Sequence, residues 1–202
     1  MRRFLVVALL IAACSPSDQS TEPTITTTTT HETTTSTTSR PTSTEASTTT
    51  TLAPAFGISS TAFGPGASIP VPFTCDGEDA SPSLEVVGIP LGTETLVLIV
   101  DDPEAPLGTW DHWVEYDIAV ESGSVQIDGA SGPIGTQGVN SWNLPGYRGP
   151  CPPEGEQHQY HFRVYALDRL LDLPAGSEST RVYAAMEGNV LDSVELVGVY
   201  ER

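Results

Sequence analysis

The chain has 202 residues, of which 26 are Asp or Glu and 8 are Lys or Arg, so its formal net charge is −18 at pH 7. A field of this sign repels nucleic acid and anionic lipid headgroups, which argues against a nucleic-acid-binding function. The same charge favours solubility in an extracellular or salty medium.

Residues 1–14 have the pattern of a secretory signal: a basic start, a short apolar run and small residues before Cys14. The run is too short to remain as a membrane-spanning helix. The tetrad 11–14, Ile-Ala-Ala-Cys, resembles a bacterial lipobox, which implies cleavage before Cys14 and lipid attachment to its thiol. An ordinary cleavage that leaves Cys14 without a role is the alternative. We therefore expect a secreted protein, lipid-anchored on the extracytoplasmic face of the bacterial cell membrane.

Residues 15–55 are mostly Thr and Ser with scattered Pro, and they contain almost no apolar side chain before Leu52. Such a segment cannot bury enough apolar surface to offset the entropy of ordering, so we expect a disordered tether. As a free coil it would reach about 35 Å. Thr- and Ser-rich stretches with Pro are also typical of O-glycosylated stalks.

Residues 56–202 are long enough for one domain that buries roughly 70% of its chain surface. This domain contains two cysteines, Cys75 and Cys151. An even count outside the cytoplasm favours a disulfide, which would stabilise the domain by about 4 kcal/mol. Two buried free thiols are the alternative. No Cys/His spacing indicates zinc, so we expect no metal site, and no cofactor is expected either.

The strand pattern predicts a mostly antiparallel β-sandwich with one or two short helices. The run 96–100 is apolar on both faces, which indicates a strand buried on both sides, and Pro103 must end it. Further strands are expected at residues 84–87, 112–118, 125–127, 157–167 and 194–200. Ser179 or Thr180 is expected to cap a short helix that Gly188 ends.

Alternation predicts the orientation of two of these strands. In the first, His112, Val114, Tyr116 and Ile118 are expected to face the core, and Trp113, Glu115 and Asp117 to face water. In the second, the predicted inward residues are His158, Tyr160, Phe162, Val164 and Ala166.

Two further segments are less regular. Residues 69–73 are expected to be an extended edge, and residues 128–153 form a long Gly- and Pro-rich loop of the kind that is often functional.

Polar residues stand where these strands begin or end. Asp102 follows the buried strand, His112 heads one inward stripe, and His158 and Tyr160 head another. If the strands are neighbours, the four side chains converge in an apolar pocket. A carboxylate beside an imidazole favours the imidazolium, which donates to an anion. The alternative is that each group is satisfied separately within the fold.

Four ordered motifs resemble the phosphatidylethanolamine-binding protein family, in particular its bacterial Raf-kinase-inhibitor-like branch. They are Asp-Pro-Glu-Ala-Pro at 102–106, Trp-Asp-His-Trp at 110–113, Gly-Tyr-Arg-Gly-Pro-Cys-Pro-Pro-Glu-Gly at 146–155, and His-Gln-Tyr at 158–160 followed by Val-Tyr-Ala-Leu-Asp at 164–168. The resemblance covers nearly all of residues 56–202. It implies a β-sandwich with a pocket for phosphate, acetate or a phosphoethanolamine headgroup.

The resemblance also implies which residues form the pocket. Its polar groups would be Asp102, His112, His158 and Tyr160, and its walls Ala105, Pro106, Trp110, Gly149 and Pro153. Two positions depart from the family pattern: Glu104 stands where Asp is usual, and Asn189 stands where bacterial members often carry His. A role for the second position is therefore not expected in this chain.

Three functions remain open. The favoured one is a membrane-anchored binding module for a small anion or phosphorylated headgroup. The second is a protease-inhibitor-like or other protein-modulating module, with a secreted protease or surface protein as its partner. The third is a hydrolase in which Asp102 orients His112 or His158 as a general base. The third is disfavoured because the chain has no Gly-x-Ser-x-Gly motif and no metal-ligand spacing.

Overall fold

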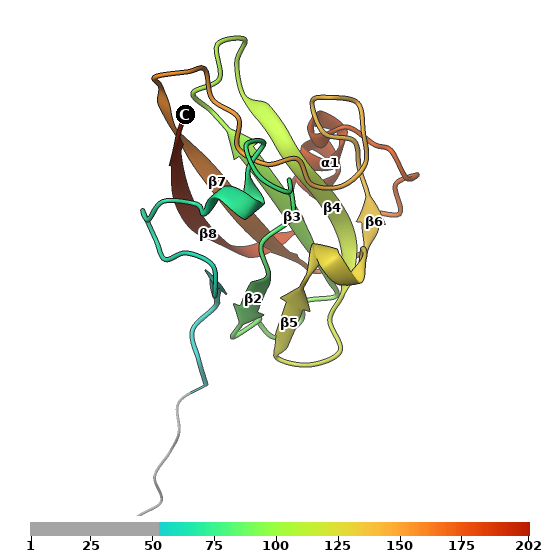
Figure 1. Ribbon diagram of the computed structural model, residues 1–202. Coiled ribbons are helices and arrows are strands. Elements are labelled where there is room, and N and C mark those ends of the chain that lie inside the picture. Colours follow the sequence, from blue (N-terminus) through green and yellow to red (C-terminus); the bar gives the residue numbers. More distant parts are fainter. Residues whose placement is uncertain (1–52) are drawn as a thin grey trace, which may run out of the picture. The chain divides into compact units, whose positions relative to one another are not determined.

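Two antiparallel sheets and one α-helix form the described part of the chain, residues 53–202 of this computed structural model (Figure 1). The predicted signal sequence, the lipid-attachment residue Cys14 and nearly all of the predicted tether lie outside the described residues. None of the described helices is long and apolar enough to cross a membrane.

The smaller sheet has the strand order β1-β2-β5, and the larger has the order β6-β4-β3-β7-β8. The small sheet contains β1 (Gly57–Ser60), β2 (Leu84–Val87) and β5 (Ser124–Ile127). The large sheet contains β3 (Thr95–Asp102), β4 (Trp110–Ala119), β6 (Thr136–Gln137), β7 (Gln157–Leu167) and β8 (Val190–Glu201). The remaining elements are the helix α1 (Ser179–Met186) and two 3-10 turns, Val71–Phe73 and Gly129–Ser131. The predicted mainly-β antiparallel sandwich is thus confirmed.

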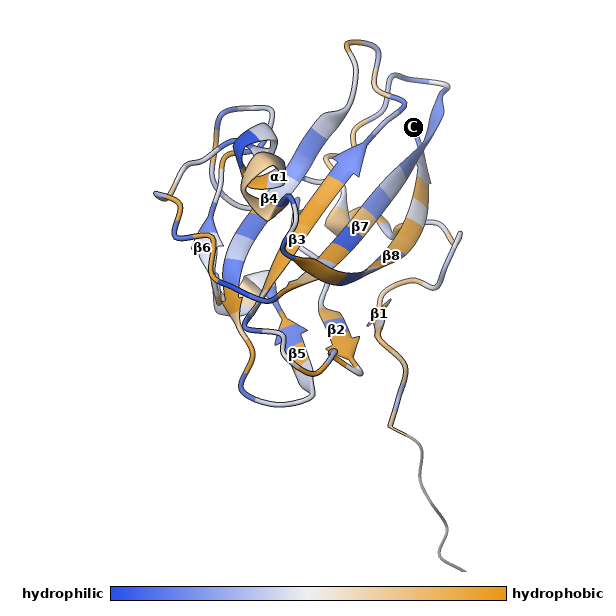
Figure 2. Ribbon diagram, turned by 180° about the vertical axis from the view of Figure 1, so that it is seen from behind, coloured by the Kyte–Doolittle hydropathy of each residue, from blue (hydrophilic) through white to orange (hydrophobic). Residues whose placement is uncertain are grey.

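Strand β3 lies at the centre of the structure, and all eight of its residues are buried. It pairs with β4 on one side and β7 on the other. One face, with Leu96 and Leu98, packs in the main core between the sheets. The other face, with Val97 and Ile99, packs in a second cluster with α1 (Figure 2). The run 96–100 is apolar on both faces because the small sheet covers one face of β3 and the helix α1 covers the other.

In β4 the residues predicted to face inward are buried, but the prediction that Trp113 and Glu115 face water is wrong, because both faces of this strand are covered. Trp113 lies in the main core, whereas Val114 and Tyr116 pack in the cluster that contains α1. Glu115 is fully buried and accepts hydrogen bonds from Ile134 N, Gly135 N and Gln137 Nε2. Of the residues that the alternation assigned to the core, Val114 and Tyr116 pack in the helix cluster and Ile118 packs in the main core. A fully bonded carboxylate, that of Glu115, occupies a position that the alternation assigned to water.

The orientation predicted for β7 is confirmed. His158, Tyr160, Phe162, Val164 and Ala166 are all buried, and the alternate positions Gln159, His161 and Arg163 are not. This strand pairs with β3 and β8 and has no register shift until its last residues, so the alternation persists along its length.

Two local predictions need correction. Ser68 bridges to Val199 of β8 as an edge, but Val71–Phe73 turn into a 3-10 helix, because the fixed φ of proline suits that turn as well as an extended chain. Helix α1 has Glu178 as its N-cap residue, without a side-chain cap. The hydroxyl of Ser179, which the sequence offered as a cap, instead donates to Asp111 of β4.

A disulfide joins Cys75 and Cys151, which are 76 residues apart in the sequence. It ties the segment after the first 3-10 turn to the end of the Gly- and Pro-rich loop. The backbone N–H of Cys75 also donates to the carbonyl of Pro150 at 3.1 Å, so the two segments are joined by a hydrogen bond as well.

We expect the double variant Cys75→Ser/Cys151→Ser to lose about 4 kcal/mol of unfolding free energy, because a loop of this length is no longer closed in the unfolded chain. Guanidinium chloride unfolding followed by circular dichroism measures the difference. Wild-type protein under reducing conditions is the control and should unfold like the variant. A variant as stable as the oxidised protein would contradict the expectation.

Candidate functional site

An extra residue in β4 directs His112 into the space between the sheets. Asp111 pairs with Asp101 of β3, and Trp113 pairs with the preceding residue, Val100, so His112 has no partner on β3. This is a β-bulge, which re-aims the side chains around it. Asp111 bonds to Ser179 of α1 on one face, whereas the ring of His112 lies edge-on to Tyr160 on the other, with centroids 5.2 Å apart.

Asp102 is the last residue of β3 and is held from two sides. The backbone N–H of Glu104 donates to its Oδ1 at 2.9 Å, which fixes the turn that Pro103 begins. Its other oxygen, Oδ2, accepts from Nδ1 of His158 at 2.7 Å. His158 is the second residue of β7, the strand beside β3, and lies beyond the last paired positions, Asp101 and His161, so it reaches Asp102 past the end of the pairing.

These side chains meet in a cavity of about 390 Å³. Of the nine predicted ligand-binding residues, seven line it: Asp102, Ala105, Pro106, Trp110, His112, Pro153 and His158. Tyr160 lies behind His112 and is fully buried. Gly149 does not line the cavity; its N–H donates to Asp79, and a Cβ there would lie 2.5 Å from the carbonyl oxygen of Phe73. The structure therefore brings seven of the nine predicted residues to one cavity, with Tyr160 behind His112 and Gly149 outside the lining.

The ring of His112 presents one nitrogen to the protein and leaves the other for a ligand. Nδ1 lies 2.7 Å from the carbonyl oxygen of Arg148, which only accepts, so Nδ1 carries a hydrogen. Nε2 makes no hydrogen bond to any of the residues 53–202. Burial lowers the pKa of His112 below its ordinary value and outweighs the opposing effects of the Arg148 carbonyl and the Asp102 charge. In the unliganded protein the ring is accordingly neutral near pH 7.

His158 behaves in the opposite way. Burial alone would lower its pKa, but the hydrogen bonds to Asp102 and Glu156, with the charges of Asp102 and Glu104, outweigh burial and raise the pKa. Its Nδ1 faces Asp102, and its Nε2 lies 3.3 Å from Glu156 Oε2, so each nitrogen donates to a carboxylate. The ring is thereby stabilised as an imidazolium, and Asp102 and His158 form a buried ion pair.

The hydroxyl of Tyr160 is buried and has no hydrogen-bond partner among the described residues. Burial, together with the charge of Asp102, raises the pKa of this phenol far above its ordinary value, so the group keeps its proton. A buried donor without a partner is costly, and ligands or waters commonly satisfy such groups. The hydroxyl is a second unused polar group at this site.

Five further residues line the cavity that the sequence analysis did not assign to it: Leu107, Trp142, Cys151, Pro152 and Arg202. Trp142 packs edge-on against both His112 and Trp110, with ring centroids 5.1 and 5.5 Å away. The sequence offered one indication of this role for Trp142, namely its position in the long Gly- and Pro-rich loop. Arg202 follows β8, and no motif near it indicated a role at the site.

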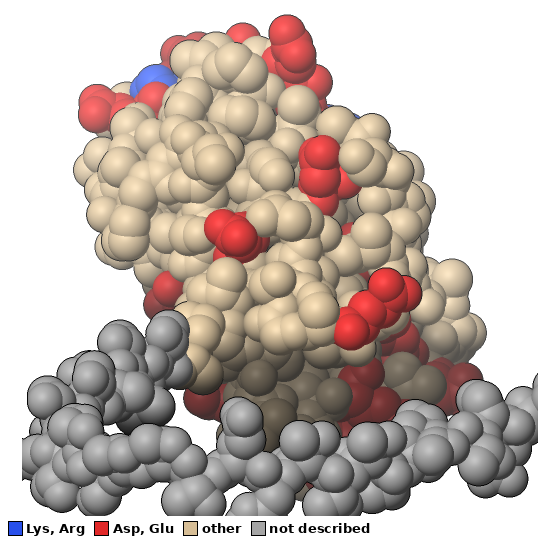
Figure 3. All heavy atoms as spheres, turned by 90° about the horizontal axis from the view of Figure 1, so that it is seen from below, with Lys and Arg blue, Asp and Glu red and all other residues tan. Residues whose placement is uncertain are grey.

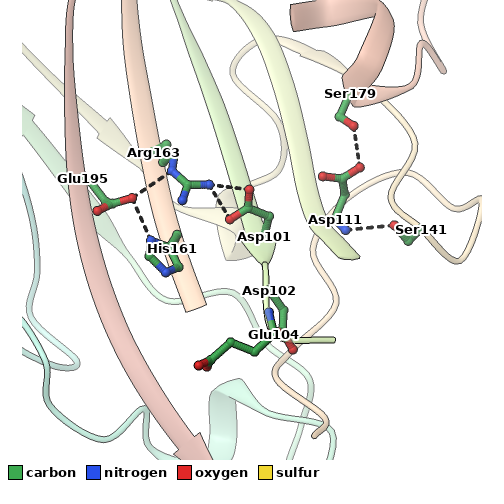
Figure 4. A network of polar contacts seen from close by, with 9 residues as sticks. All are labelled: Asp101, Asp102, Glu104, Asp111, Ser141, His161, Arg163, Ser179 and Glu195. Atoms are coloured by element: carbon green, nitrogen blue, oxygen red, sulfur yellow. Dashed lines mark hydrogen bonds and ion pairs between the residues drawn. The ribbon is translucent and has the colours of Figure 1, made fainter. Parts of the chain in front are cut away.

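The neighbouring Asp101 belongs to a different network, on the opposite side of the sheet (Figure 4). Arg163 of β7 lies between Asp101 and Glu195 of β8 and is bonded to both. His161 donates to the same Glu195 at 2.8 Å. The two consecutive carboxylates at the end of β3 therefore have different partners, and His158 and His161 lie on opposite faces of β7.

The two departures from the family pattern have structural partners outside the cavity. Glu104 accepts from the backbone N–H of Gln159 at 2.6 Å. Asn189 donates to the carbonyl oxygens of Ala185 and Glu187 at the end of α1. In residues 53–202, no group of three or more His, Cys, Asp or Glu is arranged to hold a metal ion.

Comparison with known proteins agrees with this architecture. Residues 59–201 match the family model described as phosphatidylethanolamine-binding protein. The chain is 44% identical over 149 residues to a UPF0098 protein of Methanothermobacter thermautotrophicus, covering 72% of this chain and 98% of the relative. It is 43% identical over 149 residues to a UPF0098 protein of Pyrococcus horikoshii, covering 71% and 75%.

Two crystal structures have the same fold. One is of a putative phosphatidylethanolamine-binding protein homologue from Chlamydia trachomatis, with a TM-score of 0.68, 35% identity and coverage of 73% of this chain and 98% of that one. The other is of YbcL from E. coli, described as a member of the mammalian family, with a TM-score of 0.67, 29% identity and the same coverage. The chain belongs to the phosphatidylethanolamine-binding protein family, which supports a ligand-binding module.

We expect Asp102→Asn to lower the pKa of His158, because the carboxylate that stabilises the imidazolium is lost while burial remains. A pH titration of the ring nitrogens by NMR measures the change. Glu156→Gln is the matched control and should cause a smaller decrease, since Glu156 is exposed and its oxygen is farther from the ring. An unchanged His158 pKa in Asp102→Asn would contradict the ion pair.

Proposed function

We propose that the protein is a membrane-anchored, extracytoplasmic binding module whose cavity takes a small anion or a phosphorylated headgroup. The observation that carries the proposal is the convergence of Asp102, His112 and His158 in one 390 Å³ cavity. Beside them, His112 Nε2 and the Tyr160 hydroxyl have no hydrogen-bond partner among the described residues. These are the groups that a bound anion would engage.

Each polar group has a distinct part in binding. His112 takes up a proton when an anion enters and donates from Nε2, since the negative charge offsets the cost of charging a buried ring. The hydroxyl of Tyr160, behind the His112 ring, keeps its proton because its pKa is raised, so it is a donor for a ligand or water that reaches past that ring. Asp102 holds His158 in place, and the pair contributes an oriented dipole with no net charge. Trp110 and Trp142 exclude water, which strengthens these contacts.

The size and lining of the cavity support a small ligand. Its volume of about 390 Å³ lies at the lower end of the range for small-molecule pockets. Apolar residues make up most of its wall and leave a few polar groups to fix the ligand's orientation. Phosphate and phosphoethanolamine present charged oxygens that suit His112 and Tyr160.

The membrane anchor is the part of the proposal that rests on sequence alone. The lipobox-like segment ending at Cys14 and the Thr- and Ser-rich segment 15–55 would hold the domain near the membrane on a tether.

On the face shown in Figure 3, acidic side chains are spread over the surface and Lys or Arg are almost absent. Such a face does not favour direct docking on anionic lipids or nucleic acid.

The lining of the cavity favours binding over catalysis. It contains no Ser or Thr, and its cysteine, Cys151, is joined to Cys75. The lining therefore offers no hydroxyl or free thiol as a nucleophile. His158 donates from both nitrogens, so it does not serve as a general base in this state.

Isothermal titration calorimetry with inorganic phosphate and O-phosphoethanolamine tests the proposal. We expect wild type to bind at least one of them, and His112→Ala to bind at least tenfold more weakly, because a charge-assisted hydrogen bond is lost. His161→Ala, a histidine on the opposite face of the same sheet, is the control and should bind like wild type. A wild-type protein that binds neither ligand would contradict the proposal.

Anion binding should strengthen as pH falls. Burial holds the pKa of His112 below its ordinary value in the free protein, and a bound anion raises it, so binding takes up a proton. Sulfate is a suitable probe because it does not titrate between pH 6 and 8. We expect the Kd for sulfate to decrease by up to tenfold for each unit by which the pH is lowered, until the His112 ring of the free protein is itself protonated. In His112→Gln this dependence should be lost, and its persistence there would exclude His112 as its source.

A further inference from the structure

We infer that Arg202 is the cationic residue that makes this cavity select doubly charged phosphoryl groups over singly charged carboxylates. The inference rests on the proposed function and names the ligand class of the same site. Arg202 follows the last strand, β8, and lines the cavity together with Cys151 and His158. It is the only Lys or Arg among the cavity-lining residues of the described chain.

The charges deep in the cavity explain why such a residue is needed. Asp102 and His158 form an ion pair of zero net charge. His112 is neutral in the free protein, because burial lowers its pKa. Glu156 adds a further carboxylate next to His158. These groups offer no net positive charge, and the charge of Arg202 is itself offset by Asp76, so a dianion depends on the directed donors of the guanidinium rather than on a net positive field.

The side chain of Arg202 is fixed at the mouth by a chain of contacts. Its Nε donates to Asp76 Oδ1 at 3.1 Å, and the other oxygen of Asp76 accepts from the Tyr200 hydroxyl at 2.8 Å. Asp76 is the neighbour of Cys75, which the disulfide joins to Cys151 in the cavity wall. The guanidinium is thus anchored through a bonded carboxylate next to a covalent crosslink.

The backbone of Arg202 is also held. Its carbonyl oxygen accepts from Gly155 N at 2.6 Å, and its N–H donates to the carbonyl of Glu156 at 3.3 Å. These bonds join the last residue of the chain to the segment that leads into β7, two residues before His158. Arg202 is therefore fixed relative to the ion pair at the cavity floor.

The far edge of the guanidinium is left for a ligand. Nη1 lies 3.6 Å from Cys151 Sγ, which is a weak acceptor, and Nη2 makes no hydrogen bond to any of the residues 53–202. The side chain is 38% exposed, so a ligand can reach it. Two donors in one plane match two oxygens of a phosphoryl group, and a dianion gains more from that contact than a monoanion does.

A purely structural role for Arg202, closing the end of β8 against Asp76, makes a different prediction. Loss of the ion pair would then change stability but would leave the ratio of phosphate to acetate affinity unchanged. That ratio is therefore the readout that separates the two roles.

The test is calorimetry on the full chain at pH 8, with inorganic phosphate and with acetate, for wild type, R202Q and R202K. We expect R202Q to weaken phosphate binding about tenfold and acetate binding less than threefold, since a charged hydrogen bond contributes most to a dianion. R202K keeps the charge but not the planar pair of donors, so an intermediate loss is expected. R181Q, on the exposed side of α1, is the matched control and should bind both anions like wild type.

Equal losses for phosphate and acetate in R202Q, or no loss for phosphate, would overturn the inference while leaving the proposed function intact. Failure of wild type to bind either anion would instead reject the proposed function, and this inference with it. Circular dichroism establishes that R202Q is folded. If it is not, R202K decides: at least a threefold loss for phosphate supports the inference, and wild-type affinity overturns it.

Discussion

The buried ion pair between Asp102 and His158 is the interaction on which the site depends. A carboxylate that is 4% exposed at the end of a strand needs a partner, and the neighbouring strand supplies one at 2.7 Å. The second imidazole, His112, has no carboxylate partner: its Nε2 is open, and burial lowers its pKa. The two histidines therefore differ in role: His158 is charged and bonded to protein carboxylates, and His112 is neutral with one nitrogen available to a ligand.

The bulge at His112 is the geometric condition for that arrangement. In a regular strand, Asp111 and Trp113 would lie on one face and His112 on the other. The inserted residue lets Asp111 point to the helix side while both His112 and Trp113 point inward. The same region carries the Gly- and Pro-rich loop, whose Trp142 and Arg148 carbonyl complete the surroundings of the His112 ring. The pairing of β3 with β4 and β7, together with the bulge at His112, therefore brings Asp102, His112 and His158 into the lining of one cavity.

Much of this could be predicted from sequence, and the failures have physical causes. Apolar runs and alternation located β2, β3 and β7, because those strands are regular and each face has one environment. The orientation of β4 could not be read from alternation, since a helix buries its second face and bulges shift its period. Asp102, His112 and His158 were found because they stand at strand ends beside recognisable motifs. Arg202 could not be found from the sequence, since only the folded chain brings the end of β8 to the cavity.

The central claim is that a single cavity, formed by Asp102, His112 and His158, is where an anion binds. A crystal structure of the protein grown with phosphate tests it most directly. The account predicts a phosphate in this cavity, with an oxygen within about 3 Å of His112 Nε2, as a charge-assisted hydrogen bond requires. Phosphate bound only elsewhere, or a cavity closed by its own side chains with Asp102 out of reach of His158, would contradict it.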